Sequence, residues 1–497
     1  MSVRVAWRRS LAFNGLVLQY LAIPLLFPLL LAIYYGESTI PFVVTIAITL
    51  GIGTGLTRLD SDEDLRSREA FLLVALAWLS VAIVGAIPFI IADAGPLSQP
   101  VNALFESMSG LTTTGATILR TFEYPRSIMM WRQLIQWLGG LGILVLAVAI
   151  LSRLSVGGAQ LMETESRARE HTDRLTPHIA DTARLIGSLY LGLTLLAIVV
   201  LYGLGASGIA PEMTLYNAIA HAFTSVGTAG FSPEPLSAAA FAPAAQYALM
   251  VFMTLGSTNF VLLYFLLRGR FGRLRKSEEL RFYLGSIGVL AGLVVVILFL
   301  AGPTDSIEAT IRHGLFNVVS IVTTTGYANA DYTEWTAFAQ FFLFVGMFLG
   351  GMAGSTTCSI KSLRWLMILK SFRRDLFTAV HPEAIRPVRI AGDPVDETAI
   401  RDIYGYVLLA IIGVVVTTTV IAVDGARADL SITAFDALGA AASTFLNIGP
   451  AFGPAGPFGT YDVFPTTTKI AMVIAMWIGR IEIFPVLVLL SPAYWRS

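Results

Sequence analysis

Charged residues and cysteines are scarce in this sequence of 497 residues. Charged side chains make up 13% of the chain, and Cys358 is its single cysteine. A typical soluble protein is about 25% charged, so this composition excludes a soluble multidomain enzyme. One cysteine cannot form a disulfide within the chain. Basic and acidic residues number 33 each, and this neutral balance gives no reason to expect nucleic-acid binding.

Motifs of nucleotide and metal chemistry are missing as well. The sequence has no Walker loop, no GxGxxG unit, no HExxH and no nucleophile elbow. We therefore expect no enzyme activity and no cofactor bound to this chain. Hydrophobic residues, in contrast, make up 55% of the sequence. The composition predicts an all-α membrane protein.

Ten apolar runs approach or exceed the length of about 20 residues that a bilayer-spanning helix needs. We expect spans at 11–34, 40–56, 70–92, 128–151, 183–205, 244–267, 282–302, 337–369, 402–423 and 468–490. The basic N-terminus MSVRVAWRRS precedes the first run, and no small-residue cleavage site follows it. This run is therefore predicted to be a signal anchor rather than a cleaved signal peptide.

The basic residues predict how the chain is oriented. If the N-terminus lies inside, 26 of the 33 basic residues fall in inner segments and five in outer segments. The remaining two, Arg132 and Arg480, fall within spans. Positive charge collects on the cytoplasmic side of membrane proteins. We therefore expect a multi-pass protein with both termini in the cytoplasm.

Four of the predicted outer segments resemble one another. Each has a short apolar stretch of helical character and then a turn containing glycine, and they are 102–117, 215–232, 312–329 and 434–453. Helices this short cannot cross a bilayer, so they are predicted to be re-entrant. The pattern indicates a pseudo-fourfold repeat of helix, pore loop and helix around one ion pore. Two extra N-terminal helices precede it.

This repeat predicts five units. We expect a two-helix extension at 1–69, followed by repeats at 70–182, 183–280, 281–400 and 401–497. Each repeat contains one of the four glycine turns, and the third also contains an interruption of its second helix.

The glycine turns predict an ion-selective filter. Non-helical backbone at membrane depth is tolerated where protein buries it or it lines a water-filled cavity, and rings of carbonyls can replace an ion's hydration shell. One such turn alone is more often an ordinary Ser/Thr/Gly turn, but four in equivalent positions favour a filter. None of the residues is charged, which suits a monovalent cation. They are Thr113, Thr114, Gly115, Ser225, Val226, Gly227, Thr324, Thr325, Gly326, Asn447, Ile448 and Gly449.

Three further features stand out. Arg480 lies in the last predicted span, where a charge costs about 2.5–3.5 kcal/mol, so it either forms an ion pair, for example with Glu482, or lies beside the ion path. Glu106 and Asp436, on two of the short helices, are predicted to support the filter backbone.

The eighth span has a break that is either a packing kink or a mobile loop beneath the filter. Its residues are Gly350, Gly351, Gly354, Ser355 and Thr356.

The sequence resembles the TrkH-type subunits of bacterial potassium uptake systems, in the superfamily that includes KtrB and plant HKT transporters. The segments TTTGAT, SVGTAGFS, TTTGYAN and NIGPAFG are similar to the four filter strands of that family, in order. Residues 136–158, 256–264, 350–364 and 476–490 resemble the second helices of the four repeats. The two helices before Arg66 resemble the extra N-terminal pair, so the resemblance covers nearly the whole chain.

The resemblance implies potassium selectivity, because all four loops have glycine where sodium-passing members tend to have serine in the first. It implies K⁺ ligands at Thr113, Thr114, Ser225, Val226, Thr324, Thr325, Asn447 and Ile448. It further implies that the break in the eighth span and Arg480 act in gating. A homodimer in the bacterial cytoplasmic membrane, with surrounding lipid and a TrkA-like cytoplasmic ring that binds the nucleotide, is also implied.

Alternatives remain open at this stage. The protein could be a pore or a symporter coupled to H⁺ or Na⁺, or it could be a Na⁺-permeable relative. A secondary transporter of another solute is less favoured, because such folds typically use inverted repeats. Here the predicted re-entrant loops all lie on one face.

Overall fold

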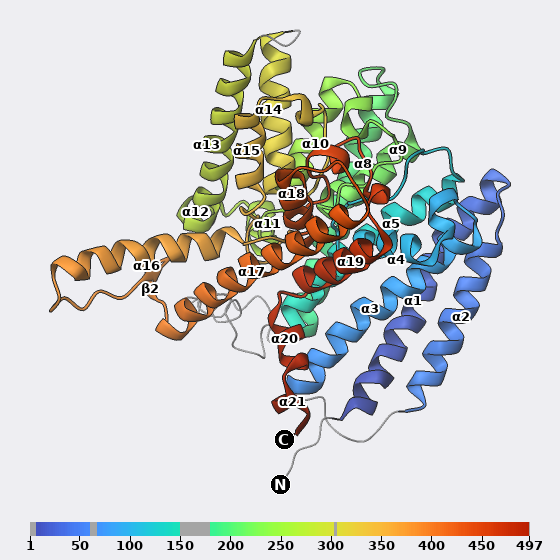
Figure 1. Cartoon of the computed structure of the whole chain (residues 1–497), viewed down its shortest axis with the longest axis horizontal. Coiled ribbons are helices and arrows are strands. Elements are labelled where there is room, and N and C mark those ends of the chain that lie inside the picture. The colour runs from blue at the N-terminus through green and yellow to red at the C-terminus, as the bar shows by residue number, and fades with distance from the viewer. Residues whose placement is uncertain (1–5, 60–66, 150–178, 303–305, 497) are drawn as a thin grey trace.

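The computed structural model describes residues 6–59, 67–149, 179–302 and 306–496. This part of the chain is built from helices that pack around a buried centre (Figure 1). The strands β1 (Arg389–Ile390) and β2 (Asp393–Pro394) form one short antiparallel pair. The expected all-α polytopic fold is confirmed. Residues 150–178, which hold several of the basic residues of one predicted inner segment, lie outside the described residues.

The N-terminal extension is a pair of long helices, α1 (Trp7–Tyr35) and α2 (Ile40–Thr57). They approach most closely where Gly15 faces Gly53, since a Cβ added to Gly15 would lie 2.7 Å from the carbonyl oxygen of Gly53. This pair packs on α3 and α5 of the first repeat. The extension is therefore joined to the rest of the bundle along one side.

Each repeat starts with a long helix and continues with a short one. It ends with a second membrane segment, which is one helix in the first repeat and a broken pair of helices in the other three. The first repeat holds α3 (Ser67–Ile91), α4 (Pro100–Leu111) and α5 (Arg126–Ala149). The second holds α8 (Ile179–Ala206), α9 (Leu215–Val226), α10 (Pro243–Gly256) and α11 (Phe260–Leu267). The third holds α13 (Glu278–Ala301), α14 (Ile307–Val322), α15 (Ala337–Gly346) and α16 (Ser362–Val380). The fourth holds α17 (Glu397–Arg427), α18 (Ala434–Phe445), α19 (Thr466–Arg480) and α20 (Phe484–Leu490).

Short elements connect these helices. They are η1 (Gly95–Ser98), η2 (Ser237–Ala240), α12 (Phe271–Lys276), η3 (Tyr332–Glu334), η4 (Gly453–Ala455), η5 (Tyr461–Val463) and α21 (Pro492–Arg496). The exact boundaries of the five predicted units stay predictions.

Three of the ten predicted spans are not continuous helices. In the described part of the chain, seven helices are long and apolar enough to cross a membrane: α1, α2, α3, α5, α8, α13 and α17. The span predicted at 244–267 is bent by 110° between α10 and α11, because the Asn259 side chain caps the start of α11. The span predicted at 337–369 stops at Gly346 and resumes at Ser362. The span predicted at 468–490 breaks after Arg480, because Glu482 and Ile483 adopt positive φ.

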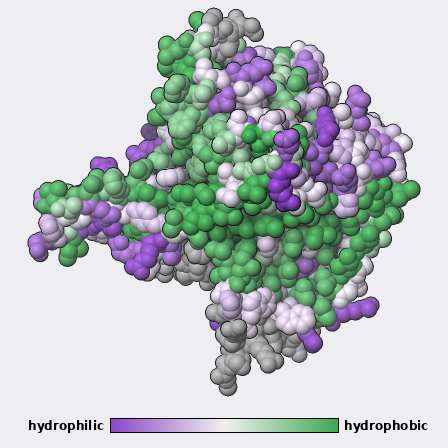
Figure 2. Space-filling model, in the orientation of Figure 1, coloured by the Kyte–Doolittle hydropathy of each residue, from purple (hydrophilic) through white to green (hydrophobic). Residues whose placement is uncertain are grey.

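The outer surface of the bundle is apolar. Figure 2 shows hydrophobic side chains over much of the visible face. Among the spanning helices, Val199 of α8 is 68% exposed and Leu300 of α13 is 83% exposed. The short helices α4, α9, α14 and α18, in contrast, are largely buried. Apolar residues outside and short helices inside identify a multi-pass membrane protein.

Candidate functional site

The four short helices end in the same backbone turn. Each is followed by a residue with φ near +50° and, two positions later, by a glycine with positive φ. The first residues of these pairs are Thr113, Thr228, Thr324 and Asn447, with φ of 54°, 48°, 53° and 57°. The glycines are Gly115, Gly230, Gly326 and Gly449, with φ of 82°, 80°, 82° and 109°. A left-handed threonine costs about 1–2 kcal/mol, so each turn is held by its surroundings.

One backbone hydrogen bond closes each turn. The amide of the residue just before the glycine donates to a carbonyl in the last turn of the short helix. The bonds are Thr114 N to Ser109 O at 2.8 Å, Ala229 N to Thr224 O at 2.8 Å, Thr325 N to Ser320 O at 2.9 Å and Ile448 N to Ser443 O at 2.9 Å. The loops therefore leave the four helices along equivalent paths.

The four glycines contact one another's loops in cyclic order. A Cβ added to Gly115 would lie 2.5 Å from the carbonyl oxygen of Ala229, and one added to Gly230 would lie 1.9 Å from that of Thr325. A Cβ on Gly326 would lie 2.1 Å from Ile448 O, and one on Gly449 would lie 2.5 Å from Thr114 O. Real Cβ atoms essentially never come within 3.0 Å of such an atom. The loops thus close a ring that admits only glycine, which we call the glycine ring.

The structure corrects the prediction for the second loop. Gly227 caps α9 with φ of −72°, and Ser225 and Val226 are the last residues of that helix. The residues equivalent to Thr113, Thr114 and Gly115 are therefore Thr228, Ala229 and Gly230. The prediction failed because SVG at 225–227 has a composition similar to TTG in the first and third loops, although its glycine lies before the true position at Gly230.

A signal in the sequence could have found the correct register. Every ring glycine stands six residues after a serine or threonine of the short helix, namely Ser109, Thr224, Ser320 and Ser443. Six residues before Gly227 stands His221. In the other three loops the structure brings together the predicted residues, Thr113 to Gly115, Thr324 to Gly326 and Asn447 to Gly449.

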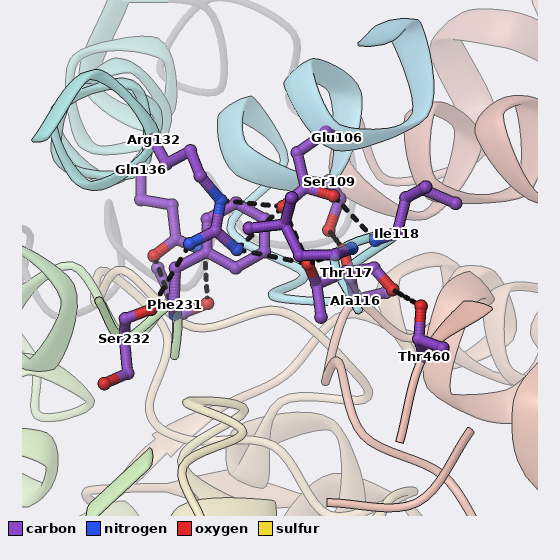
Figure 3. Close-up of polar contacts among 12 residues, drawn as sticks. Glu106, Ser109, Ala116, Thr117, Ile118, Arg132, Gln136, Phe231, Ser232 and Thr460 are labelled. Carbon is purple, nitrogen blue, oxygen red and sulfur yellow. Dashed lines mark hydrogen bonds and ion pairs between the residues drawn. The ribbon is translucent and has the colours of Figure 1, made fainter. Parts of the chain in front are cut away.

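A buried ion pair holds the first loop (Figure 3). Glu106 of α4 accepts hydrogen bonds from the Ile118 amide at 2.8 Å and the Thr117 hydroxyl at 2.9 Å. Arg132 of α5 lies 2.7 Å from the same carboxylate, and both side chains are at most 1% exposed. The prediction that Glu106 supports the loop backbone is confirmed. Asp436 instead caps the start of α18 by accepting from the Thr433 amide.

Arg132 and Gln136 join the first loop to the second. The Arg132 guanidinium donates to the carbonyl of Ser232 at 3.2 Å and stacks 4.0 Å from the ring of Phe231. One turn further along α5, Gln136 donates to Ala229 O at 2.6 Å and accepts from the Phe231 amide at 3.0 Å. Sequence reasoning missed both roles, because the partners lie about 95 residues away from α5 in the chain.

The break between α15 and α16, residues 347–361, forms a non-helical segment that we call the inner loop. It lies against the left-handed residues of three of the four loops that form the glycine ring. The Thr356 hydroxyl is 2.9 Å from that of Thr228, and the Cys358 amide donates to the Thr324 hydroxyl at 3.1 Å. The Cys358 sulfur is 3.8 Å from the hydroxyl of Thr113.

The inner loop is not a kink in a continuous helix. It fits into the break between α10 and α11, where Asn259 donates to Ala353 O at 2.8 Å and the Phe260 amide donates to Gly354 O at 3.1 Å. A Cβ on Gly351 would lie 2.7 Å from Ser257 O, so close packing requires a glycine there. The predicted residues Gly350, Gly351, Gly354, Ser355 and Thr356 all lie in this segment. Their role in gating stays a prediction.

Arg480 is buried beside the inner loop. Its side chain is 2% exposed, and one terminal nitrogen lies 3.0 Å from Thr356 O and 2.6 Å from the Cys358 sulfur. The other donates to Gly139 O at 2.9 Å. The ion pair with Glu482, one of the two alternatives for Arg480, is not formed, since that carboxylate binds Lys361 at 3.2 Å and Arg364 at 2.6 Å. Among the described residues, Arg480 pairs with carbonyls and a thiol rather than a carboxylate.

A cavity of about 210 Å³ lies on the other side of the glycine ring. All four ring glycines line it, together with Arg120 and Glu234. The inner loop contacts the left-handed residues and the cavity contacts the glycines, so the two lie at opposite ends of the ring. The glycine ring thus lies between this cavity and the inner loop, inside a bundle of apolar helices.

Four loops that meet in a ring inside an apolar helical bundle define a membrane transport protein of pseudo-fourfold architecture. The family model described as TrkH, cation transport protein, matches residues 38–497. The chain belongs to this family, whose members are transporters and not enzymes.

Similar proteins support this membership over the full length. The chain is 35% identical to the Trk system potassium uptake protein TrkH of Halomonas elongata, with 99% of each chain covered. It is 33% identical to the protein of the same name from Vibrio parahaemolyticus, over 99% of this chain and 100% of the relative. The crystal structure of the potassium transporter TrkH from Vibrio parahaemolyticus matches with a TM-score of 0.86 and 31% identity, covering 98% of this chain and 99% of that one.

Proposed function

We propose that this chain takes up potassium ions across the bacterial cytoplasmic membrane through a K⁺-selective pore. The observation that carries the proposal is the glycine ring, in which each glycine lies against a carbonyl of the next loop in closed cyclic order. This arrangement brings backbone carbonyls of four loops around one axis. Similar proteins named for potassium uptake support the choice of ion.

The selectivity filter would consist of three residues from each loop. They are Thr113, Thr114, Gly115, Thr228, Ala229, Gly230, Thr324, Thr325, Gly326, Asn447, Ile448 and Gly449. Backbone carbonyls of these residues would replace the hydration shell of the ion. The short helices direct their partly negative C-terminal ends toward the same place, which favours a cation. Because no filter residue is charged, the ring suits a monovalent ion rather than a divalent one.

The direction of transport follows from the proposed orientation. With both termini in the cytoplasm, the cavity lined by the ring glycines faces outward and the inner loop faces the cytoplasm. The membrane potential would draw K⁺ inward with about 2.3 kcal/mol per charge for each 100 mV. The filter residues would select the ion, while the inner loop would control its passage.

The inner loop and Arg480 would form the gate. Thr356 and Cys358 touch three of the four filter loops, so an ion leaving the filter inward meets the inner loop directly. Arg480 holds this loop through the Thr356 carbonyl and the Cys358 sulfur. Opening would require these contacts to break. The buried positive charge would also limit how many cations gather at the inner mouth.

We further propose a homodimer with a cytoplasmic gating ring as its partner. Helix α16 extends away from the centre of the bundle (Figure 1). Figure 2 shows hydrophobic side chains on this projecting part of the molecule. Its exposed apolar residues are Leu369, Phe372, Leu376 and Val380, and Ile385 follows them. An apolar surface of this kind marks an interaction site, and we assign it to a second copy of the chain. The nucleotide would bind the ring rather than this chain.

Growth of a bacterium that lacks potassium transport tests the proposal. Cells that express this chain with its gating partner should grow at low external K⁺, and Rb⁺ should replace K⁺ better than Na⁺ does. Failure to grow would contradict the proposed function. Flux into liposomes at defined ion gradients and membrane potential would then separate a pore from a symporter coupled to H⁺ or Na⁺, because only the symporter moves K⁺ against its electrochemical gradient.

A further inference from the structure

A second and larger cavity adjoins the cavity at the glycine ring, and the two share Phe122, Glu234 and Pro235. It has a volume of about 1240 Å³ and is formed by α1, α5 and α9, together with the loop after α4, the loop before α9 and the loop after α9. We call it the side crevice. Its apolar lining includes Phe27, Leu31, Met129, Met130, Leu215 and Ile219.

The rim of the side crevice is polar and aromatic. Arg126 is exposed there, and its guanidinium carbon lies 5.0 Å from the ring of Tyr35 and 5.8 Å from that of Tyr216. The carboxylates of Glu123 and Glu212 line the same rim, with Glu234 beside them. One cation, several tyrosines and several carboxylates therefore surround the mouth of an apolar cavity.

The exposure of the α1 residues near the side crevice shows whether lipid or water borders it. Leu26, Leu30 and Ile33 of this helix are 47%, 63% and 62% exposed, so the helix faces lipid on its outer side. Phe27 and Leu31 line the crevice from the same helix, one turn apart. The tyrosines at the end of α1 mark the boundary between hydrocarbon and water, where aromatic residues collect. The crevice therefore opens at the edge of the bilayer, with its apolar part at the depth of acyl chains.

We propose that the side crevice binds one outer-leaflet phospholipid with an amine-bearing zwitterionic headgroup. Its acyl chain would lie against Phe27, Leu31 and Ile219, and its phosphate would contact Arg126. Its ammonium group would lie among Glu123, Glu212 and the tyrosine faces, where carboxylates and aromatic rings attract cations.

Charge and size both favour this occupant. The rim offers one positive group for a phosphate and several negative groups for an amine, whereas a purely anionic headgroup would be repelled by the carboxylates. The volume of the side crevice exceeds the range of about 300–1,000 Å³ that is usual for small-molecule sites. A long amphiphile requires this larger volume. The proposal rests on the orientation proposed above, but it does not depend on the identity of the transported ion.

Native mass spectrometry of the purified full-length protein tests this proposal. After delipidation, phosphatidylethanolamine and phosphatidylglycerol are added back separately. We expect one phosphatidylethanolamine per chain at low lipid concentration, and Arg126→Gln should weaken its binding about tenfold, the usual effect of losing one charge-assisted hydrogen bond. Arg427→Gln is the matched control, because this arginine is also on the outer side and its side chain is 76% exposed, but it does not line the crevice.

A second variant guards against misfolding. Ile219→Trp should fill the apolar part and reduce lipid binding while leaving Arg126 in place, and thermal unfolding of each variant reports on the fold. Equal binding by wild type and both crevice variants would overturn the proposal. Equal binding of the two lipids would overturn the headgroup assignment. Ion uptake is not measured here, so failure of the proposed pore function would not change the result.

Discussion

The Cα of Gly230 lies against the carbonyl oxygen of Thr325 so closely that a Cβ would come within 1.9 Å of that oxygen. The same relationship recurs between the other neighbouring loops, at 2.1 to 2.5 Å. Each contact joins loops from two different repeats, so the closed ring exists only when all four repeats have come together. The glycine ring is therefore a product of the assembled bundle rather than of any one loop.

Substitution of Gly230 by alanine should abolish selective K⁺ uptake. The new Cβ would collide with Thr325 O, and φ of +80° is costly for any residue other than glycine. The measurement is the ratio of Rb⁺ to Na⁺ flux in liposomes. Gly203→Ala is the control, because Gly203 lies in α8 with no atom within 4 Å of an added Cβ. A Gly230→Ala protein with unchanged selectivity would refute the register assigned here.

Replacement of Arg480 by alanine should raise ion flux in the absence of the gating partner. The variant loses the hydrogen bonds to Thr356 O and Gly139 O, so the inner loop is no longer held against the filter. Liposome flux with the purified chain alone measures the leak. Arg480→Lys keeps the charge but cannot reach both carbonyls, so an intermediate leak is expected. If both variants stay as closed as the wild type, Arg480 does not hold the gate.

Replacement of Glu106 by glutamine should destabilise the protein strongly. Arg132 would keep its charge in a site where it is 1% exposed, and removing one partner of a buried ion pair costs about 3–5 kcal/mol. Thermal unfolding in detergent measures the loss. The double variant Glu106→Gln/Arg132→Met should recover part of it, because no unpaired charge remains. Additive losses in the double variant would show that the two residues act independently.

Acidic pH should reduce the stability that the loop around Asp462 gives the folded protein. Burial raises the pKa of this carboxyl, but Lys469 at 2.7 Å and Arg120 at 2.6 Å outweigh burial and hold the pKa below its ordinary value. A lowered pKa in the folded state stabilises the protein above the unfolded pKa of about 3.9, and this contribution is lost as the pH falls through the folded value. The thermal unfolding temperature should therefore fall less steeply between pH 5 and about pH 3 for Asp462→Asn than for the wild type. Parallel curves for the two proteins would contradict this role.

Much of the architecture could be predicted from local patterns. The lengths of the apolar runs indicated membrane helices, and the recurrence of a short helix followed by glycine indicated re-entrant loops. Both signals depend on neighbouring residues alone. The glycines within 337–369 predict the break in that span, whereas the hydropathy of 244–267 and 468–490 gives no sign of theirs. Asn259 caps a new helix and Ile483 adopts positive φ inside these apolar runs, and hydropathy registers neither a cap nor a positive φ.

The register of the second filter loop could not be read from composition. Gly227 and Gly230 each stand two residues after a small polar residue, Ser225 and Thr228. Helix α9 ends so that only Gly230, six residues after Thr224, reaches the ring. The contacts of Arg480 could not be read from the sequence for a similar reason. Glu482 is two residues away, but the break after α19 turns it toward Lys361 and Arg364.

Membrane spans, a fourfold repeat and neutral re-entrant loops can be read from the sequence, since they follow from hydrophobic length, charge distribution and glycine spacing. The packing of the ring glycines against neighbouring loops, the contacts of Arg480 and the position of the side crevice emerge only in the folded bundle. These depend on contacts between residues such as Gly449 and Thr114, which lie at opposite ends of the chain. Chain distance hides such contacts, and only close packing of the four repeats creates them.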